Sequence, residues 1–360
     1  MMYEYWFSKI QGISAVKKRR MREYFGNAVS IYNIEETGKY LPDFVNDKEK
    51  EILKCAKKET DLEEQYQKLE KLNIRFIPQH SGQYPGRLKN IDHPPYALYV
   101  KGELPKEHQL SVAIVGARNC TPYGEVLSLE YGQELAKYGV QIISGMARGV
   151  DAFAQRGTLN NGGKTYAVLG CGANICYPKE HWGLYEDICR TGGIISEYVP
   201  DTPPLSMNFP ARNRIISGLA DIVLVIEAKE KSGSLITADM ALDQGKDVYA
   251  LPGPVTSALS QGCHYLISQG AGILISPSEL LKELHVSDRK QEQKTDKNKK
   301  ELERPENIVY SCLDLYPKGI QTLIEETGLN PRQVIKELTG LELEGKVKEI
   351  SKNHYVRTKV

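Results

Sequence analysis

Short apolar runs alternate with amphipathic stretches through the middle of the chain, and this alternation constrains the fold more than any other feature. Several of the runs are apolar throughout, as strands covered on both faces must be. The runs lie at residues 112–115, 140–143, 166–169, 194–196, 222–226 and 248–251. The stretches with the apolar spacing of helices lie at residues 123–138, 151–160, 181–190, 213–219 and 235–244. Strand and helix in strict rotation predict an α/β fold, a doubly wound parallel sheet.

Composition divides the remainder of the chain into smaller parts. Residues 1–80 have a mostly helical pattern, clearest over 52–72, which is rich in Lys, Glu and Leu. Residues 287–304 contain twelve charged residues and one apolar residue. Such a segment cannot bury enough surface to order itself, so it is predicted to be a flexible linker. The sheet domain is then expected over residues 81–286.

Residues 305–360 are predicted to be a small separate module. The pattern indicates three helices, the second from about residue 320 and the third over 331–344, followed by a hairpin over 345–356. This order predicts a winged-helix-like module. Its last residues are basic, and the hairpin could contact either DNA or a protein partner.

A basic helical stretch near the N-terminus gives a second, weaker indication of nucleic-acid contact. Residues 10–14 read Ile-Gln-Gly-Ile-Ser and precede Lys17, Lys18, Arg19, Arg20 and Arg22. This arrangement is similar to a helix-hairpin-helix element, whose turn meets a phosphate backbone. A basic helix face that is merely solvated is the alternative.

Charge and cysteine usage exclude several classes of protein. Lys and Arg number 47 and Asp and Glu 46, a formal net charge of +1, so a polyanion must be held by a local patch. The beginning of the sequence lacks the pattern of a signal peptide, and no stretch has the roughly 18 apolar residues that span a bilayer. The seven cysteines show no C-x-x-C spacing and the seven histidines are scattered. We therefore expect a cytoplasmic protein with reduced thiols, no metal site and no membrane contact.

The turns that follow the strands carry the candidate functional residues, because the carboxyl ends of parallel strands share the edge where ligands bind. Glycine lets a ligand approach the backbone, serine offers a hydroxyl, and Arg and Lys supply positive charge, as an anionic phosphate requires. Any single turn is better explained by turn and cap formation, but five on one edge favour a phosphate-binding surface. Its predicted residues are Gly116, Arg118, Ser144, Gly145, Lys179, Phe209, Arg212, Asn213, Arg214, Ser232, Gly233 and Ser234.

Phe209 has two possible roles. It lies in a long loop that is predicted to follow the fourth strand and to end at Arg214. An aromatic ring next to Arg212 and Arg214 could stack on a nucleobase while the arginines hold the flanking phosphates. The ring could equally be a core anchor that fixes the loop.

Signatures of nucleotide-dependent enzymes are absent. Residues 163–165 read Gly-Lys-Thr, but they precede a strand and lack the first glycine of a Walker A loop. Gly170 and Gly172 are followed by Ile175 where a dinucleotide fingerprint has its third glycine or alanine. Neither segment supports ATP or NAD, so no cofactor is expected.

Three carboxylates lie at strand ends or helix starts and could serve as an acid or base: Asp151, Glu197 and Glu227. Asp151 also suits a helix N-cap, which is the commoner use of Asp at such a position. No G-x-S-x-G or H-E-x-x-H motif occurs. We predict no catalytic residue.

Taken together, the motifs of the strand-end turns resemble those of the DNA-processing protein A family (DprA, also called Smf). The resemblance covers roughly residues 84–277. It rests on Gly116-Ala117-Arg118, Ser144-Gly145-x-Ala147-x-Gly149-Val150-Asp151, Tyr177-Pro178-Lys179, Phe209-Pro210-x-Arg212-Asn213-Arg214 and Ser232-Gly233-Ser234-Leu235-Ile236-Thr237-Ala238.

The resemblance implies a non-enzymatic protein that binds single-stranded DNA through an extended Rossmann-like domain. Such a protein protects incoming DNA and helps to load the RecA recombinase during natural transformation, generally as a homodimer. Carried over by position, Arg118 and Lys179 are expected to hold phosphates. Phe209 and the Arg212-Asn213-Arg214 triplet would line the same pocket, and Ser232-Gly233-Ser234 would complete its floor.

A nucleotide-binding or nucleotide-hydrolysing Rossmann-like enzyme or sensor is the alternative, because related folds process nucleotides. The P-G-G-x-G-T-x-x-E signature of the phosphoribohydrolase relatives is absent from the sequence. The sequence therefore favours the DNA-binding interpretation.

Overall fold

The chain divides into two compact units in the computed structural model, Met1–Leu284 and His285–Val360. The structure describes residues 1–34, 41–58, 61–286, 309–310, 312–313 and 318–358. The segment predicted to be a flexible linker, residues 287–304, lies outside the described residues.

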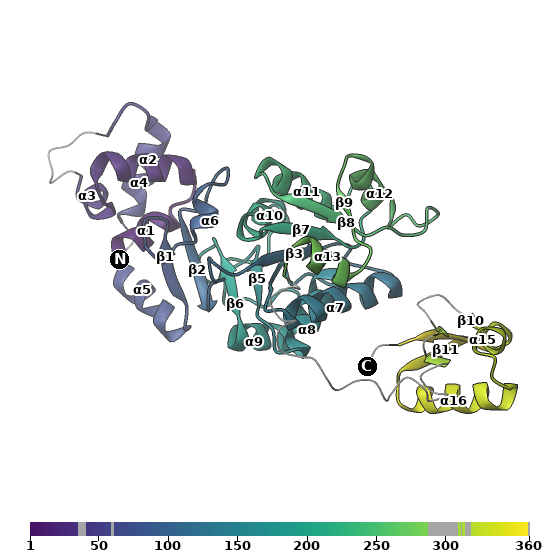
Figure 1. Cartoon of the computed structure of the whole chain (residues 1–360). Coiled ribbons are helices and arrows are strands. Elements are labelled where there is room, and N and C mark those ends of the chain that lie inside the picture. The colour runs from purple at the N-terminus through teal and green to yellow at the C-terminus, as the bar shows by residue number, and fades with distance from the viewer. Residues whose placement is uncertain (35–40, 59–60, 287–308, 311, 314–317, 359–360) are drawn as a thin grey trace. The chain divides into compact units, whose positions relative to one another are not determined.

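A nine-stranded sheet forms the centre of the first unit (Figure 1). Its strand order is β1-β2-β6-β5-β4-β3-β7-β8-β9. All neighbours from β6 to β9 in this order pair in parallel, whereas β2 pairs antiparallel with both β1 and β6. The strands are β1 (Arg75–Pro78), β2 (Ala97–Gly102), β3 (Ser111–Val115), β4 (Gln141–Ser144), β5 (Thr165–Leu169), β6 (Gly193–Ser196), β7 (Ile222–Val225), β8 (Asp247–Ala250) and β9 (Gly272–Ile273). The predicted doubly wound parallel sheet is confirmed, and the six predicted strands correspond to β3 through β8.

The sheet grows outward from β3 in two directions, and this topology determines where a ligand can bind. The chain first builds β4, β5 and β6 on one side of β3, then crosses back to place β7, β8 and β9 on the other. Because the loops after β3 and β7 leave the sheet toward opposite faces, the carboxyl ends of these neighbours flank a crevice, the usual ligand site of such sheets.

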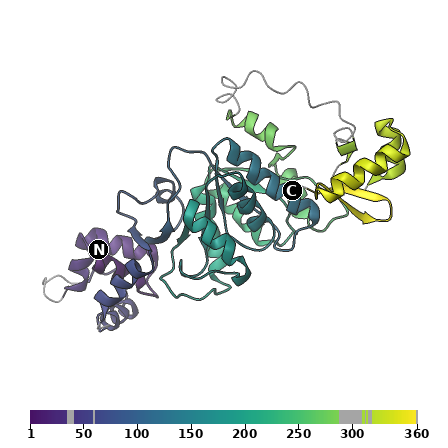
Figure 2. The ribbon, with the colours of Figure 1, turned by 90° about the horizontal axis from the view of Figure 1, so that it is seen from below.

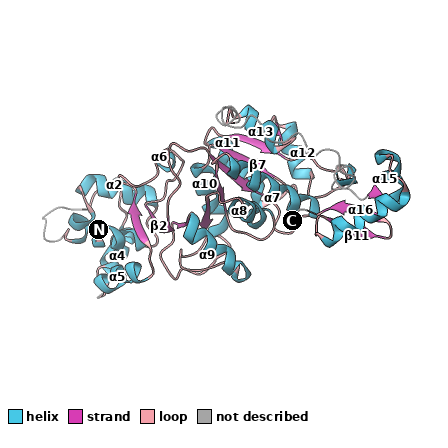
Figure 3. Cartoon of the chain, turned by 60° about the horizontal axis from the view of Figure 1, so that its bottom comes forward, coloured by secondary structure: helices cyan, strands magenta, loops and turns pink. Residues whose placement is uncertain are grey.

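Helices cover both faces of the sheet (Figures 1 and 2). On one face lie α7 (Pro122–Lys137), α8 (Val150–Asn160) and α9 (Trp182–Thr191), and on the other α10 (Asn208–Leu219) and α11 (Gly233–Asp243). Figure 3 shows the strands enclosed between these helices. The remaining helices of this part are α6 (Gly86–Lys89), η1 (Lys179–His181), α12 (Gln261–Ser268) and α13 (Pro277–Glu283).

The start of α10 differs from the sequence prediction. The helix begins at Asn208, whereas a loop was expected up to residue 214. Pro210 does not delay the helix, because a proline in the first turn lacks only an N–H that would have no partner there. The Asn208 side chain fixes this start by donating to the carbonyl of Gly170 at 3.0 Å. Phe209 and Arg212 therefore lie on a helix.

Residues 1–72 form a helical region that shares its core with the sheet. Its helices are α1 (Met2–Lys9), α2 (Ala15–Phe25), α3 (Ala28–Tyr32), α4 (Asp47–Ala56) and α5 (Leu62–Lys71), so the single helical run predicted over 52–72 is two helices. Trp6 and Phe7 of α1 pack in one buried cluster with Tyr99 of β2 and Leu169 of β5. The chain then enters β1 at Arg75, and the boundary expected at residue 80 falls inside the sheet, between β1 and β2.

In the described part of the second unit, the second and third predicted helices are followed by the predicted hairpin. The first of the three predicted helices falls largely outside the described residues. The described elements of this unit are β10 (Lys318–Gly319), α15 (Ile320–Thr327), α16 (Pro331–Leu343), β11 (Val347–Ser351) and β12 (His354–Arg357), with strand order β10-β12-β11. Asn330 and Gln333 form a capping box at the start of α16. Among the described residues of this unit, the buried apolar cluster consists of Val309, Leu313, Leu323, Val334, Leu338, Leu341 and Val347.

Candidate functional site

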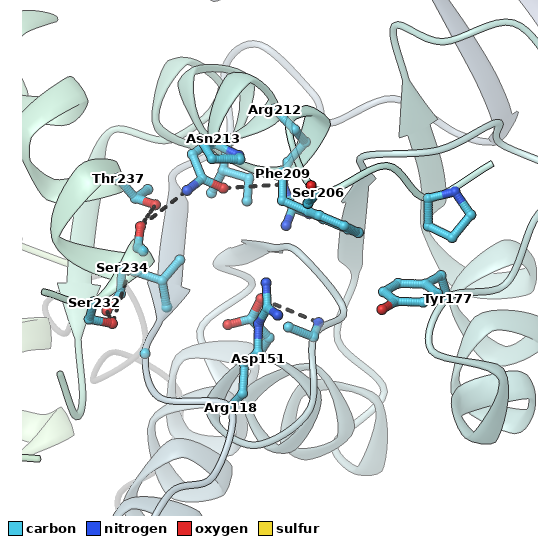
Figure 4. Close-up of a pocket in the computed structure, with 17 residues that line it drawn as sticks. Arg118, Asp151, Tyr177, Ser206, Phe209, Arg212, Asn213, Ser232, Ser234 and Thr237 are labelled. Atoms are coloured by element: carbon cyan, nitrogen blue, oxygen red, sulfur yellow. Dashed lines mark hydrogen bonds between the residues drawn. The ribbon is translucent and has the colours of Figure 1, made fainter. Parts of the chain in front are cut away.

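A cavity of about 430 Å³ lies at the crevice between the carboxyl ends of β3 and β7 (Figure 4). The turns after both strands contribute to its wall, together with the first turns of α8, α10 and α11. Most of the predicted site residues line it: Gly116, Arg118, Phe209, Arg212, Asn213, Ser232, Gly233 and Ser234. The structure therefore brings together residues that are spread over more than one hundred positions of the sequence.

Arg118 supplies an accessible positive charge beside two aromatic rings. Its side chain is exposed and points into the cavity (Figure 4). Its guanidinium carbon lies 5.6 Å from the centre of the Phe209 ring, within the range of a cation–π contact. The ring of Tyr177 lies 5.4 Å from that of Phe209 and is itself 41% exposed. Charge and flat apolar surface are thus available to one ligand.

The position of Phe209 is compatible with both of the roles considered for it. The ring is half-buried and lines the cavity. On its other side it packs against Gly170, where an added Cβ would lie only 2.9 Å from a ring carbon. The contact with Gly170 fixes the ring while part of its surface remains open to the cavity.

Arg212 is a buried cation that connects four segments around the cavity. Its side chain donates to the carbonyl of Gly145 at 3.0 Å, to the carbonyl of Val168 and to Oδ1 of Asn213 at 3.2 Å. Asn213 in turn donates to the carbonyl of Gly233 at 3.2 Å. Burial lowers the pKa of Arg212, against the pull of the Asp151 carboxylate. The guanidinium thus ties the turn after β4 to the start of α11.

Asp151 is a second buried charge in the cavity wall. Its carboxylate accepts from the backbone N–H of Gly145 at 3.0 Å and of Ala147 at 3.4 Å. Burial raises its pKa, although Arg212 and the two amides draw it down. The expected N-cap role is wrong in detail, since Gly149 is the N-cap of α8 and Asp151 lies in the first turn. Asp151 and Arg212 both form a hydrogen bond with the backbone of Gly145.

The start of α11 forms the opposite wall. Ser232 is its N-cap and accepts from the N–H of Ser234 at 3.3 Å, while the two hydroxyl oxygens lie 2.7 Å apart. The N-terminus of a helix carries partial positive charge and unpaired N–H groups, which favour an anion. Together with Arg118 this wall can hold a phosphate group.

Four predicted residues do not line the cavity: Ser144, Gly145, Lys179 and Arg214. Ser144 is buried at the end of β4 and donates to the carbonyl of Ile114 at 2.6 Å. Gly145 lies behind Arg212, so that an added Cβ would meet the guanidinium at 2.5 Å. Lys179 is exposed in η1, two residues beyond the cavity residue Tyr177.

Arg214 points away from the cavity although Arg212 lines it. A helix turns by about 100° per residue, so side chains two positions apart face opposite sides. Arg214 makes two hydrogen bonds to the Glu197 carboxylate, at 2.6 and 2.7 Å, and a third to the carbonyl of His93. Its charge is therefore neutralised within the protein.

The cavity also includes residues that the sequence reasoning did not select, among them Tyr177, Ser206, Ile216 and Thr237. Tyr177 could have been found, because it immediately precedes Pro178-Lys179 in a turn that was selected. Ile216 and Thr237 follow from the helical periodicity of α10 and α11 once the starts of these helices are known.

Two of the carboxylates considered as acids or bases are engaged in structural contacts. Glu197 is paired with Arg214. Glu227 accepts from the backbone N–H of Thr121 at 2.8 Å and from its hydroxyl at 2.6 Å. Thr121 ends the loop that carries Arg118 and caps α7, so Glu227 fixes this loop to the end of β7.

The basic stretch of α2 is largely occupied by contacts within the protein. Lys17 pairs with Glu49 at 2.7 Å, and Arg22 pairs with Glu4 at 2.8 Å. Lys18 is buried and donates to the carbonyl of Ser8 at 2.7 Å, and burial lowers its pKa to about 7. These three cations serve the packing of the helical region.

Other kinds of site find no support in the described part of the chain. No three His, Cys, Asp or Glu side chains there converge as the ligands of a metal ion would. None of the described helices is both long and apolar enough to cross a membrane.

Comparison with known proteins agrees with the motifs of the strand-end turns. The model of the family described as DNA recombination-mediator protein A matches residues 75–285. The chain belongs to this family. The match begins at Arg75, the first residue of β1, so the recombination-mediator domain includes the two antiparallel strands that the sequence reasoning missed. A second model, the DprA winged helix domain, matches residues 293–351 and confirms the predicted winged helix.

Relatives of this DNA recombination-mediator family are similar over most of the sheet domain. Protein Smf of Escherichia coli is 46% identical over 217 residues, which cover 60% of this chain and 58% of that protein. The crystal structure of DNA processing protein A from Streptococcus pneumoniae has a TM-score of 0.68 at 34% identity and covers 79% of this chain and 98% of that one. A structure of DNA processing protein A from Helicobacter pylori, described for its single-stranded DNA binding mode, has a TM-score of 0.53 at 30% identity, covering 60% and 98% of the two chains.

Proposed function

We propose that the protein is a recombination mediator that binds single-stranded DNA in the cavity between β3 and β7 and catalyses no reaction. The observation that carries the proposal is the meeting of an exposed guanidinium, two aromatic rings and a helix N-terminus in one cavity. Arg118 and the start of α11 suit the phosphates, and the rings of Phe209 and Tyr177 suit a base. The described DNA binding of the Helicobacter pylori relative supports the same ligand.

The aromatic rings favour a single strand over a duplex. A base can stack on a side chain only when it has left its own stack, as in single-stranded nucleic acid. Phosphate contact gives most of the affinity and carries little sequence preference. We therefore expect binding that is strong for single strands, weakly dependent on sequence and sensitive to salt.

The proposal extends to the partners of the DNA-bound protein. Membership in a recombination-mediator family supports a role in protecting incoming single strands and helping to load RecA during natural transformation, in the cytoplasm. A homodimer would present two cavities to one strand, and linked sites bind far more tightly than either one alone.

Arg118→Ala tests the site. We expect the affinity for oligo(dT) to fall about ten- to a hundredfold, because a charge-assisted phosphate contact is lost. The plot of log affinity against log salt should become shallower by about 0.7, the contribution of one phosphate on a single strand. Fluorescence anisotropy with labelled oligo(dT) and with a duplex of equal length, over a salt series, measures both quantities.

Two further variants make this experiment specific. Phe209→Ala should weaken binding without changing the salt slope, because stacking displaces no counterion. Arg190→Ala is the matched control, since it removes an exposed arginine from the last turn of α9 that does not line the cavity. Equal binding of single strand and duplex by the wild type, or full affinity of Arg118→Ala, would refute the proposed site.

The nucleotide-processing alternative is tested on the same protein. The cavity has the volume of a small-molecule site, so incubation with nucleoside monophosphates and chromatography of the products is informative. Free base released at an enzymatic rate would overturn the non-enzymatic proposal.

RecA loading gives a separate expected result. Wild-type protein should shorten the delay before RecA hydrolyses ATP on single-stranded DNA that is already covered by single-strand binding protein. Arg118→Ala should lose this effect, because the mediator must hold the strand that it delivers. A mediator effect retained by Arg118→Ala would separate RecA loading from the cavity.

A further inference from the structure

A second cavity, of about 510 Å³, shares a wall with the first. Arg118 and Ser232 line both cavities. The remaining wall comes from the loop after β3, the turn between β7 and α11, and the loop after β8. Its other residues are Ala117, Asn119, Lys229, Lys231, Ser257, Ala258 and Leu259.

The second cavity is basic. Arg118, Lys229 and Lys231 are all exposed, and within the described residues none of the three forms an ion pair with a carboxylate. Glu230 stands between the two lysines in the sequence but does not line the cavity. The neighbouring Glu227 is buried and bonded to Thr121, so it does not neutralise the lysines directly. Three cations on one wall favour an anionic ligand.

Backbone hydrogen bonds fix the two loops that form the cavity. The N–H of Ala228 donates to the carbonyl of Leu259 at 2.7 Å, and the N–H of Gly262 donates to the carbonyl of Ala228 at 2.8 Å. A turn holds Lys229 beside the first cavity, because the N–H of Ser232 donates to the Lys229 carbonyl at 3.1 Å. The lysines are therefore carried on a backbone that needs no rearrangement to bind.

The two cavities differ in the part of a nucleotide that they suit. The first contains the rings of Phe209 and Tyr177, whereas no aromatic side chain lines the second. Bases stack on aromatic rings, and lysines hold phosphates as point charges. The second cavity thus suits the sugar-phosphate backbone more than the bases.

We propose that the bound single strand continues from the first cavity across Arg118 and Ser232 into the second, where Lys229 and Lys231 hold the phosphates of the next nucleotides. This inference rests on the proposed function, since it names the path of the same ligand. It makes Arg118 the phosphate contact at the junction of the two cavities. Removing it affects short and long strands alike, whereas the lysines matter only for strands that reach them.

The double variant Lys229→Ala/Lys231→Ala tests the path in the full chain. With oligo(dT) of about 20 nucleotides we expect at least about a tenfold loss of affinity at low salt. The salt slope should be shallower by about 1.4, twice the contribution of one phosphate. The double variant should bind the shortest oligo(dT) that the wild type binds with the affinity of the wild type. When the nucleotides expected over the second cavity are made abasic, the double variant should lose as much affinity relative to the wild type as it does with intact oligo(dT).

The matched control is Lys106→Ala/Lys246→Ala. It removes the same charge from positions just before β3 and β8, at the amino edge of the sheet. Equal losses in the two double variants, or an unchanged salt slope in Lys229→Ala/Lys231→Ala, would overturn the path while leaving the first cavity as the site. A wild-type protein that does not bind oligo(dT) at all would overturn the proposed function together with the path.

Discussion

Arg212→Met is expected to lower the free energy of unfolding of the sheet-bearing unit by about 3 kcal/mol, because it leaves buried polar groups without a partner. The carbonyls of Gly145 and Val168 lose their donor, and the Asp151 carboxylate loses the cation that opposes its charge. Methionine fills a similar volume, so little of the loss arises from a cavity. Urea unfolding followed by circular dichroism measures the change.

The same variant should also weaken DNA binding by about tenfold or more. Arg212 supplies positive charge at the back of the cavity and, through Asn213, holds the start of α11 in place. Loss of the charge and of this tie both reduce the attraction for a phosphate. Anisotropy with oligo(dT) at a urea-free, low-salt condition measures the effect.

Arg214→Met is the matched control on the same helix. It removes an arginine that is paired with a carboxylate, and stability should fall because Glu197 is left partly buried and unpaired. Arg214 does not line the cavity, so DNA affinity should stay close to that of the wild type. Equal losses of DNA affinity in the two variants would mean that general destabilisation, and no specific role of Arg212, weakens binding.

The contrast between these two arginines shows what the sequence could and could not predict. Both stand in the Arg212-Asn213-Arg214 triplet, and both were expected in the pocket. The proline-rich sequence before this triplet favoured a loop, in which the direction of neither side chain can be predicted. Because α10 begins at Asn208, Arg212 and Arg214 lie on opposite sides of a helix, and Arg214 reaches Glu197. The residue types indicated that an arginine lines the cavity, whereas the position of each arginine on the helix determines which of the two does so.

The strands of the sheet also differ in how far the sequence predicts them. The central strands were predicted within about a residue, since their apolar runs are covered on both faces. β1 and β2 were missed because β1 has four residues and ends at Pro78, and prolines at positions 94 and 95 precede β2. Proline favours an extended connector in a sequence pattern. Pairing of β1 with β2 and of β2 with β6 depends on long-range contacts that no local pattern contains.

Gly149→Ala is expected to destabilise the protein by about 3 kcal/mol and to displace the loop that carries Arg118. Gly149 has φ +71° and ψ −131°, a backbone conformation that is essentially restricted to glycine. An added Cβ would lie 2.3 Å from the carbonyl oxygen of Ala117 and 2.6 Å from that of Arg118. The cost combines backbone strain of about 1–2 kcal/mol with overpacking of about 1–3 kcal/mol. Urea unfolding measures the stability, and anisotropy measures the DNA affinity, which should fall at least about tenfold.

Gly162→Ala separates the two parts of this cost. Gly162 also has a positive φ, +67°, but an added Cβ would meet no atom within 4 Å. This control should therefore lose only about 1 kcal/mol of stability through strain and keep its affinity for oligo(dT). If Gly149→Ala lost no more than Gly162→Ala in either measurement, contact with the Ala117 and Arg118 carbonyls would not be what holds the loop. A larger loss in Gly149→Ala alone would show that the turn after β4 positions the guanidinium that meets the strand.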